Sequence, residues 1–361
     1  MDGLPVGNKN GLNLLANHFN YHNNFFMKRS LVLIVAGFLF VTGCNKTKTE
    51  TNDAAVPEND VHATQRKCAA QEVFEEQLKA DPGIRERREQ IEQFVQRVTE
   101  NPSAYRMLRN GTIQIPVVVN ILYKTPEQNI SQAQVESQMV ALNKDYSAAN
   151  SDYNNVPDVF RSVRSGNIHI EFVLSSVNRR ETNKTKWQLN DAMKKSQQGG
   201  IDATNPTTML NMWVCKLTSG YLGYAYYPGT VAPAMDGVVI DDNAFGTIGS
   251  AEAPFNLGRT VTHEVGHWLN LQHIWGDATC GSDQVADTPP HRTANFGCPG
   301  IIPITCTNNS TTNPYGFPRE MTMNYMDYTD DACMFMFSAG QKARMMAVFA
   351  PGGPRSGYAQ P

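Results

Sequence analysis

The stretch HEVGHWLNLQH, residues 263–273, carries histidines at its first, fifth and eleventh positions. If the stretch begins as a helix, His263 and His267 lie one above the other on one face, where both imidazoles can reach one metal ion. Glu264 is the next residue round the helix and can take a proton from a water bound to that metal. The residue types and their spacing therefore predict a catalytic zinc site with Glu264 as the general base.

The third histidine requires a sharp turn in the chain. On a continuous helix His273 would lie about 9 Å beyond His267 along the axis, and on another face. Glycine is the usual residue for such a turn, and Asn is the best of the others because it tolerates positive φ. We therefore expect Asn270 to form the turn and His273 to complete three nitrogen ligands, with one position open. The alternative is a set of histidines packed in a core.

Composition indicates an ordinary globular protein. The chain has 361 residues, of which 41 % are hydrophobic and 18 % are charged, enough for one large domain or two small ones. The net charge is −3, and there is no block of Lys or Arg. These features give no reason to expect a nucleic-acid partner, and they leave the oligomeric state open.

Residues 27–44 have the pattern of an export signal. The basic pair Lys28-Arg29 precedes an apolar run that is too short to span a bilayer. The run ends in Val41-Thr42-Gly43-Cys44, which resembles a bacterial lipobox and implies a lipid on Cys44 and anchoring to a membrane or cell surface. A secretory signal with an incidental cysteine is the alternative.

The flanking residues suggest how the chain is divided. Met27 is the expected start, so residues 1–26 are expected to be a mis-called upstream extension. Residues 45–64 are polar and lack aromatic side chains, which is typical of a disordered tether. Residues 65–109 show helical apolar stripes, broken at residues 81–83, and form a small charged segment that must pack on the part of the chain after it.

Apolar periodicity beyond this segment predicts a mixed α+β fold. Strands are expected at residues 112–123, 167–177, 209–217 and 237–241, and helices at 131–146 (with Ser131 and Gln134 as a capping box), about 257–269 and 338–349. A twisted mixed sheet with long helices should face an irregular C-terminal subdomain from about residue 274, with the active cleft between them. The strand at 237–241 is the expected exposed edge for an extended substrate.

Seven cysteines are present, and four of them follow the histidine motif. In an exported protein, Cys280, Cys298, Cys306 and Cys333 predict two disulfides, with the pairing left open. A second metal site is the alternative, although the spacing has no CxxC pair. Cys215 lies in an apolar strand-like run and is expected to be a buried free thiol.

Two motifs together resemble those of a known family. HEVGHWLNLQH and, far downstream, Asn324-Tyr325-Met326-Asp327-Tyr328 are similar to the zinc signature and the Met-turn of the metzincin metallopeptidases. With HIWGD after the motif and the four-cysteine cluster, the chain resembles the pappalysin (cytophagalysin) family over about residues 112–353. The departure is Asn270, where the family usually has Gly.

The resemblance implies roles for single residues. Glu264 would activate the water and then protonate the leaving amine, with Met326 as the floor beneath one zinc and Tyr328 stabilising the oxyanion. A packed core tyrosine is the alternative for Tyr328. The other implied assignments are His263, His267 and His273 as zinc ligands, and disulfides Cys280–Cys306 and Cys298–Cys333.

The resemblance also implies latency and calcium binding. Residues 65–109 would be a pro-segment before a catalytic domain at 110–361, and Cys68 would occupy the open zinc position. Ala69 departs from the Gly that usually follows this cysteine, and a thiol without a role is the alternative. Calcium would bind near Asp283, Asp287 and Thr288, where a solvated acidic turn is the alternative.

Asp331 stands two residues before Cys333, where relatives that cut before Arg have an acidic pocket residue. A carboxylate in a pocket can pair with a guanidinium through two parallel hydrogen bonds, which Lys cannot copy. Cleavage of Xaa–Arg bonds is therefore expected, including self-cleavage at Tyr105–Arg106 or Leu108–Arg109. A surface acidic pair with Asp330 is the alternative.

The leading hypothesis is a secreted or surface-anchored zinc endopeptidase of proteins or peptides, made as a latent precursor. One rival is a catalytically inactive surface-binding lipoprotein on the same scaffold; the intact Glu264 argues against it. The other is a zinc aminopeptidase, which uses a distant Glu as third ligand; His273 argues against that.

Overall fold

The computed structural model describes residues 63–103, 111–306 and 313–359, which all belong to one unit of the chain, Asn59–Pro361. The expected upstream extension, the signal with Cys44 and almost all of the tether lie outside the described residues, as do the two candidate self-cleavage bonds. Among the described residues, no helix is both long enough and apolar enough to cross a membrane.

A five-stranded mixed sheet forms the first half of the structure. Its order is β2-β1-β3-β5-β4, antiparallel only between β5 and β4. The strands are β1 (Ile113–Tyr123), β2 (Ile170–Glu181), β3 (Leu210–Val214), β4 (Gly223–Ala225) and β5 (Val238–Ile240).

The prediction that residues 237–241 form the exposed edge of the sheet is wrong. β5 lies inside the sheet, and β4 is the edge beside the histidine motif. β4 has only three residues, too few to show the alternation that predicts a strand.

Two helices cover one face of the sheet. α3 (Gln132–Tyr146) packs on β2, α4 (Arg259–Trp268) packs on β4 and β5, and the two helices contact each other. Ser131 caps α3 by accepting a hydrogen bond from the Gln134 backbone N–H at 3.1 Å. The other half of the expected capping box is absent, because the Gln134 side chain instead donates to the Phe245 carbonyl at 2.8 Å.

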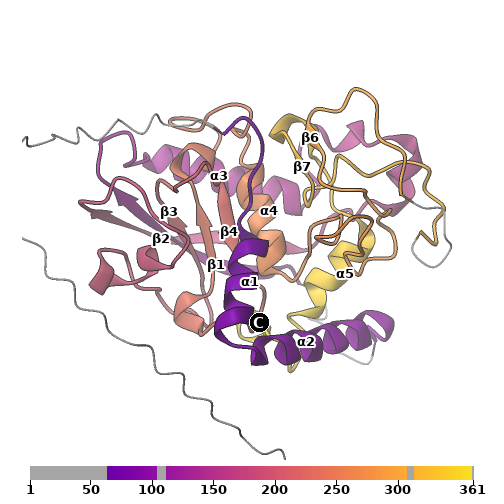
Figure 1. Cartoon of the computed structure of the whole chain (residues 1–361), viewed down its shortest axis with the longest axis horizontal. Helices are drawn as coiled ribbons and strands as arrows, with labels where there is room; N and C mark the ends of the chain where they lie inside the picture. Colours follow the sequence, from indigo (N-terminus) through magenta and orange to yellow (C-terminus); the bar gives the residue numbers. More distant parts are fainter. Residues whose placement is uncertain (1–62, 104–110, 307–312, 360–361) are drawn as a thin grey trace, which may run out of the picture. The chain divides into compact units, whose positions relative to one another are not determined.

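The second half of the structure is mostly irregular, as expected. It contains a short parallel pair, β6 (Phe296–Gly297) and β7 (Tyr328–Thr329), and the helix α5 (Ala339–Ala347), which begins with a capping box of Ser338 and Gln341. Figure 1 shows α4 between the sheet and this half. The disulfides are Cys280–Cys306 and Cys298–Cys333, the pairs that the resemblance implies, and Cys215 is a buried free thiol.

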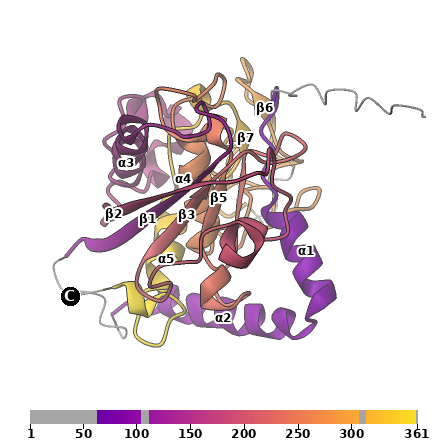
Figure 2. The same cartoon turned by 90° about the vertical axis from the view of Figure 1, so that its left-hand side faces the viewer.

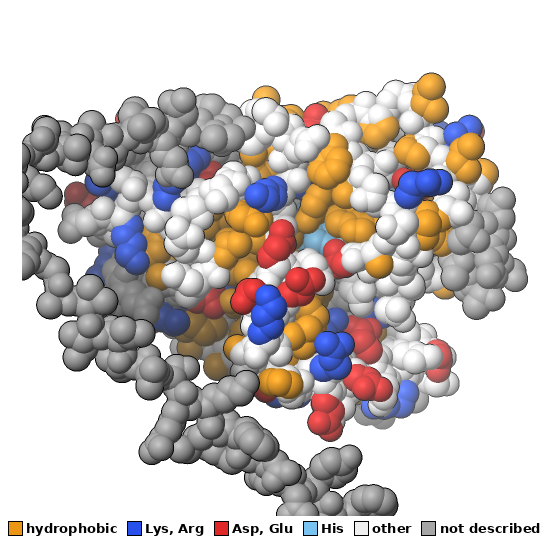
Figure 3. Space-filling view, in the orientation of Figure 1, with side chains coloured by type: hydrophobic (Ala, Val, Ile, Leu, Met, Phe, Trp, Pro, Cys, Tyr) orange, Lys and Arg blue, Asp and Glu red, His pale blue; other side chains and the backbone are white. Residues whose placement is uncertain are grey.

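Residues 63–103, called here the N-terminal segment, pack against both halves. α1 (Ala70–Ala80) lies beside β4 (Figure 1), and α2 (Gly83–Glu100) lies against α5 (Figure 2). Charged side chains of both signs gather where Figure 1 places α1 and α2 (Figure 3). The apolar sides face inward, with Val73, Ile84, Val95 and Val98 buried.

Candidate functional site

The zinc-motif helix α4 is entirely buried and ends in the expected turn. Asn270 has φ 75°, a left-handed conformation, and the Leu271 N–H donates to the Gly266 carbonyl at 2.9 Å. This closure of the helix end is the geometry that Gly or Asn permits. The chain then folds back, and His273 comes beside His267.

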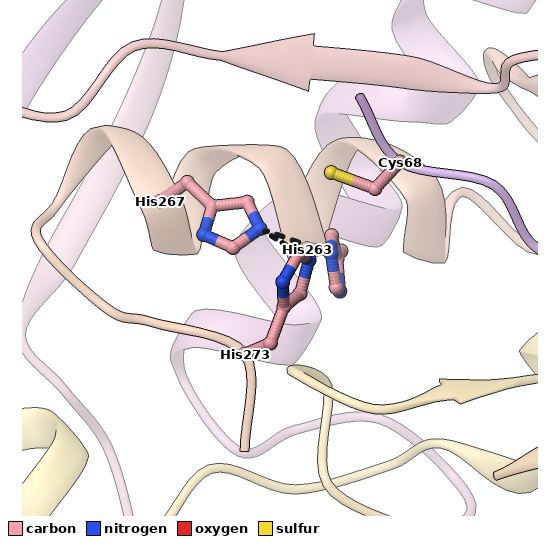
Figure 4. Close-up of side chains that lie close together, drawn as sticks. All are labelled: Cys68, His263, His267 and His273. Atoms are coloured by element: carbon pink, nitrogen blue, oxygen red, sulfur yellow. Dashed lines mark hydrogen bonds between the residues drawn. The ribbon is translucent and has the colours of Figure 1, made fainter. Parts of the chain in front are cut away.

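The three histidine side chains converge through their Nε2 atoms (Figure 4). His267 Nε2 lies 3.2 Å from His263 Nε2 and 3.1 Å from His273 Nε2. Each Nδ1 has an oxygen partner: the Tyr325 carbonyl at 2.7 Å for His263, the Leu271 carbonyl at 2.8 Å for His267, and Asp277 Oδ1 at 2.5 Å for His273. In a neutral imidazole that donates its Nδ1–H to such an oxygen, Nε2 is the nitrogen that carries the lone pair for a metal ion.

This arrangement fits a zinc ion. Tetrahedral Zn–N bonds of about 2.0–2.1 Å place neighbouring ligand nitrogens about 3.3 Å apart, close to the observed distances. Burial lowers the pKa of His263 well below its usual value and that of His267 to about 3, so both imidazoles are neutral. The oxygen partners of the Nδ1 atoms orient the rings, as partners of metal-bound histidines do.

Cys68 from the N-terminal segment lies beside the three histidines, where a tetrahedral zinc ion would have its fourth ligand. Its Sγ and the three histidines offer ligand atoms that all lie within 4.8 Å of one another, the one such group among the described residues (Figure 4). Burial and the charge of Glu264 raise the pKa of this thiol well above its usual value. A cation at the site opposes both effects and favours the thiolate.

Glu264 lies beside the Cys68 sulfur. The Cys68 thiol donates to its Oε2 at 3.4 Å, and burial raises the pKa of the Glu264 carboxyl to about 8. Tyr328 lies close as well, with its ring 5.0 Å from that of His273 and its hydroxyl donating to the Cys68 carbonyl at 3.1 Å. A base and a hydroxyl donor therefore both contact Cys68.

Met326 is fully buried beneath the helix that carries two of the histidines. A Cβ added to Gly266 would lie only 2.5 Å from Met326 Sδ. The methionine therefore touches the α4 backbone directly, on the turn between His263 and His267.

Asp331 is buried and holds Arg66 of the N-terminal segment. Arg66 Nη2 lies 2.5 Å from Asp331 Oδ1, while Asp331 Oδ2 accepts from the Leu257 and Arg259 backbone N–H groups at 2.7 and 3.2 Å. The surface-pair alternative is therefore wrong for Asp331. Arg66 itself meets Asp331 through one carboxylate oxygen, while the other accepts the two backbone N–H groups; paired hydrogen bonds to a substrate Arg stay a prediction.

The remaining nitrogens of Arg66 find partners that the motifs did not indicate. Nη1 donates to Thr260 Oγ1 at 3.0 Å and Nε donates to the Thr329 carbonyl at 3.2 Å. The ring of Phe255 lies 5.1 Å from the guanidinium. The position of Arg66 two residues before Cys68 was the available signal for its role, since alternate residues of an extended strand share a face.

The residues expected to bind calcium do not all face one point. Thr288 Oγ1 lies 2.9 Å from each Asp283 carboxylate oxygen and 2.9 Å from the Val285 carbonyl. Burial raises the pKa of Asp283 to about 7, and a cavity of about 20 Å³ adjoins it. Asp287 instead accepts from Ser338 Oγ at 2.6 Å and the Gly340 N–H at 2.8 Å at the start of α5.

Comparison with known proteins gives consistent matches. A family model described as pregnancy-associated plasma protein-A, of peptidase group M43, matches residues 195–350. An extracellular metalloprotease of Colletotrichum graminicola is 31 % identical over 271 residues, covering 71 % of this chain and 85 % of that protein. An extracellular metalloprotease of Pyricularia oryzae is 31 % identical over 254 residues, covering 67 % of this chain and 77 % of that protein.

Solved structures of mirolysin are also similar. Mature Tannerella forsythia mirolysin in complex with a cleaved peptide is 42 % identical, with a TM-score of 0.64, and the match covers 69 % of this chain and 96 % of that chain. A mutant of promirolysin from the same organism is 39 % identical, with a TM-score of 0.70 over 81 % of this chain and 97 % of that one. With its convergent histidines and the Met-turn, this chain belongs to the pappalysin family of metzincin zinc metallopeptidases.

Proposed function

We propose that the chain is the latent precursor of a zinc endopeptidase in which Glu264 is the general base. Zinc, when bound, would polarise the peptide carbonyl and make an attacking water more acidic. The Glu264 carboxylate would accept the proton of that water and pass it to the leaving amine, and the Tyr328 hydroxyl would donate to the carbonyl oxygen as it becomes negative. The observation that carries the proposal is the convergence of the His263, His267 and His273 imidazoles beside Glu264.

Substitution of Glu264 tests this proposal. The processed Glu264→Ala protein should fold and bind about one zinc per chain but lose peptidase activity by about a hundredfold or more. Glu171→Ala, which removes an exposed carboxylate on β2, is the matched control and should remain active. Full activity of Glu264→Ala would contradict the mechanism. A processed wild-type protein that cleaves no peptide in a library would favour the inactive surface-binding alternative.

The N-terminal segment is proposed to keep the precursor inactive. Lys67 and Ala69 pair with the edge strand β4, as the Leu222 N–H donates to the Lys67 carbonyl and the Ala69 N–H to the Gly223 carbonyl, both at 2.9 Å. Cys68 between them would supply the fourth zinc ligand and exclude water. The promirolysin structure, which matches a larger share of this chain than mature mirolysin does, supports a pro-segment here.

Cleavage before Arg is the proposed specificity. Arg66 in the Asp331 pocket is a stand-in for the substrate side chain that follows the cut bond. All three of its guanidinium nitrogens donate, to Asp331, Thr260 and the Thr329 carbonyl. The single ammonium of Lys cannot make this set of contacts, and an apolar side chain would leave a buried carboxylate without a counter-charge.

Calcium is proposed to bind at Asp283, Thr288 and the Val285 carbonyl, with Asp287 close by in the chain. Carboxylate, hydroxyl and carbonyl oxygens are the ligands that calcium prefers. The raised pKa of Asp283 supports this placement, because the carboxylate is buried and the two donors that reach it, Thr288 Oγ1 and the Val285 N–H, carry no charge.

Export and lipid anchoring at Cys44 are proposed from the signal pattern and from the relatives named extracellular metalloproteases. Metabolic labelling with a fatty acid should mark the wild-type chain and not Cys44→Ala. Labelling of both proteins would contradict the anchor.

A further inference from the structure

Helix α2 is held at a surface separate from the zinc ligands. Figures 1 and 2 show it running beneath α5, while the residues that enter the site, Arg66 to Ala69, precede α1. Val95 and Val98 are buried in the main hydrophobic core, and Ile91 and Phe94 pack against it. The apolar side of α2 is therefore held independently of zinc.

A polar cluster completes the contact, with its carboxylate partly exposed and its other side chains buried. We call Arg88 and Glu92 of α2, together with Asn270 and Arg344, the Asn270 latch. Arg88 donates to Asn270 Oδ1, and Asn270 Nδ2 donates to Glu92 Oε1 at 3.1 Å. Glu92 also pairs with Arg88 at 2.9 Å and with Arg344 of α5 at 2.7 Å. Although burial opposes it, the charge of the two arginines lowers the pKa of Glu92, so this carboxylate is ionised.

Asn270 has two separate roles in this arrangement. Its backbone, at φ 75°, forms the turn that brings His273 to the other histidines, a task that Gly performs as well. Its side chain is fully buried and is used entirely by α2, with the amide oxygen on Arg88 and the amide nitrogen on Glu92. Gly at this position could not make the second set of contacts.

We propose that the catalytic domain carries a helix-binding surface at Asn270 and α5, specific for an α-helix with Arg and Glu four residues apart. Its occupant is α2, bound in cis in the precursor and in trans after the chain is cut between α2 and β1. The proposal rests on the proposed role of residues 63–103 as a pro-segment. It adds that the pro-segment has two independent anchors, Arg66 with Cys68 at the site and α2 at the latch.

Two anchors have a consequence for activation. A cut after α2 removes only the covalent link, so the severed segment remains bound and the site remains covered. Activity then appears only when the severed segment dissociates, and opening the latch speeds this second step because Arg66 and Cys68 alone then hold the segment. Because the latch groups Arg88 and Glu92 leave with the segment, variants at these positions yield a mature enzyme identical to the wild type.

Amide hydrogen exchange on the full-length, zinc-loaded chain tests the independence of the anchors. All proteins carry Glu264→Ala to prevent self-processing. Adding Glu92→Ala should speed exchange in α2 about tenfold or more and leave residues 66–69 unchanged, whereas adding Cys68→Ala should do the reverse. Glu89→Ala, an exposed carboxylate on the same helix, is the matched control and should change neither. An unchanged α2 in Glu92→Ala, or equal effects of both variants on both segments, would overturn the proposal.

Asn270→Gly makes the same test on the catalytic domain, because Gly keeps the turn and removes the amide that Arg88 and Glu92 bind. It should keep its zinc and speed exchange in α2 as Glu92→Ala does. Unchanged exchange in this variant would also count against the proposal. Since exchange does not depend on peptidase activity, the result is independent of whether the proposed catalytic function is correct.

Retention after cleavage tests binding in trans. Limited trypsin digestion should cut at Arg106 or Arg109, which lie between α2 and β1 in the sequence. In the Glu264→Ala background, the severed segment should co-elute with the catalytic domain in size-exclusion chromatography. It should separate when Glu92→Ala is added and be retained when Glu89→Ala is added. Separation in the background protein itself would refute the trans complex.

Discussion

Asp331 binds two kinds of partner at once, which decides how its role can be tested. One carboxylate oxygen faces the guanidinium of Arg66, and the other accepts two backbone N–H groups at the start of α4. Alanine would remove both and disturb the zinc helix. Asparagine keeps one oxygen acceptor for the backbone and removes the charge, so Asp331→Asn isolates recognition from structure.

For the processed enzyme we predict that Asp331→Asn lowers kcat/KM for cleavage before Arg by about tenfold or more, because a buried guanidinium loses its counter-charge. A substrate with Leu after the cut bond should lose less, since it makes no use of that charge. Steady-state kinetics on the two matched peptides measures the ratio. Equal losses on both would show that Asp331 supports the fold and does not select Arg.

Cys68 and Cys215 are both buried free thiols, so they form a matched pair. We predict that Cys68→Ala raises the activity of the uncut precursor about tenfold or more, the change expected if losing the sulfur weakens closure by about 1.4 kcal/mol. Cys215→Ala should leave the precursor latent. Initial rates on a small fluorogenic peptide, with gels to confirm that the chain is uncut, give the comparison. A Cys68→Ala precursor as inactive as wild type would contradict the thiol switch.

Among the α-helices that the structure describes, α4 alone has every residue buried. Its ten residues are all buried, and the Met-turn touches its backbone at Gly266. A glycine inside a helix normally costs stability relative to alanine. Here a Cβ would lie 2.5 Å from Met326 Sδ, so the fully buried methionine would have to shift.

We therefore predict that Gly266→Ala destabilises the protein by about 1–3 kcal/mol through overpacking, despite the better helix propensity of alanine. Thermal unfolding of the zinc-loaded protein measures the loss. Shortening the methionine in Gly266→Ala/Met326→Ala should recover part of it, so that the double variant is more stable than the two separate losses predict. If the losses of the two single variants simply add in the double variant, the contact between Gly266 and Met326 is not the cause of the destabilisation.

Elements could be predicted where their own residues set the pattern. The helix at Gln132–Tyr146 follows from apolar spacing and from Ser131, whose cap hydrogen bond is local. Gln134, by contrast, bonds to Phe245 and Ser250, more than a hundred residues away, so its expected partner was wrong. Strands of three residues, such as β4, lack the length on which periodicity depends.

At the scale of the whole molecule, the irregular half depends on cross-links. Two disulfides hold it, and the Asp283 carboxylate lies buried among oxygens that a cation could bind. After chelation and zinc repletion, added calcium should raise Tm by about 3 °C or more, roughly 1 kcal/mol. Differential scanning fluorimetry measures this, with Asp283→Asn as the variant that should lose the response. A calcium-independent Tm in wild type would rule out a stabilising site.

The sequence alone determined the chemistry of the site and its local geometry. The four-residue spacing of His263 and His267 puts the two histidines on one helix face, and Asn270 permits the left-handed turn. The spacing and the turn could be predicted because each depends only on residues that are neighbours in the chain. The family motifs in turn predicted the disulfide pairs that the structure contains.

The distant residues that complete the site are known only from the packing of the chain. Arg66 and Asp331 lie 265 residues apart, and Arg88 lies 182 residues from Asn270, so no periodicity links them. Their pairing depends on how the N-terminal segment lies along β4 and α5. Burial then makes those partners necessary, because a charged group removed from water must find a counter-charge in whatever segment is packed beside it.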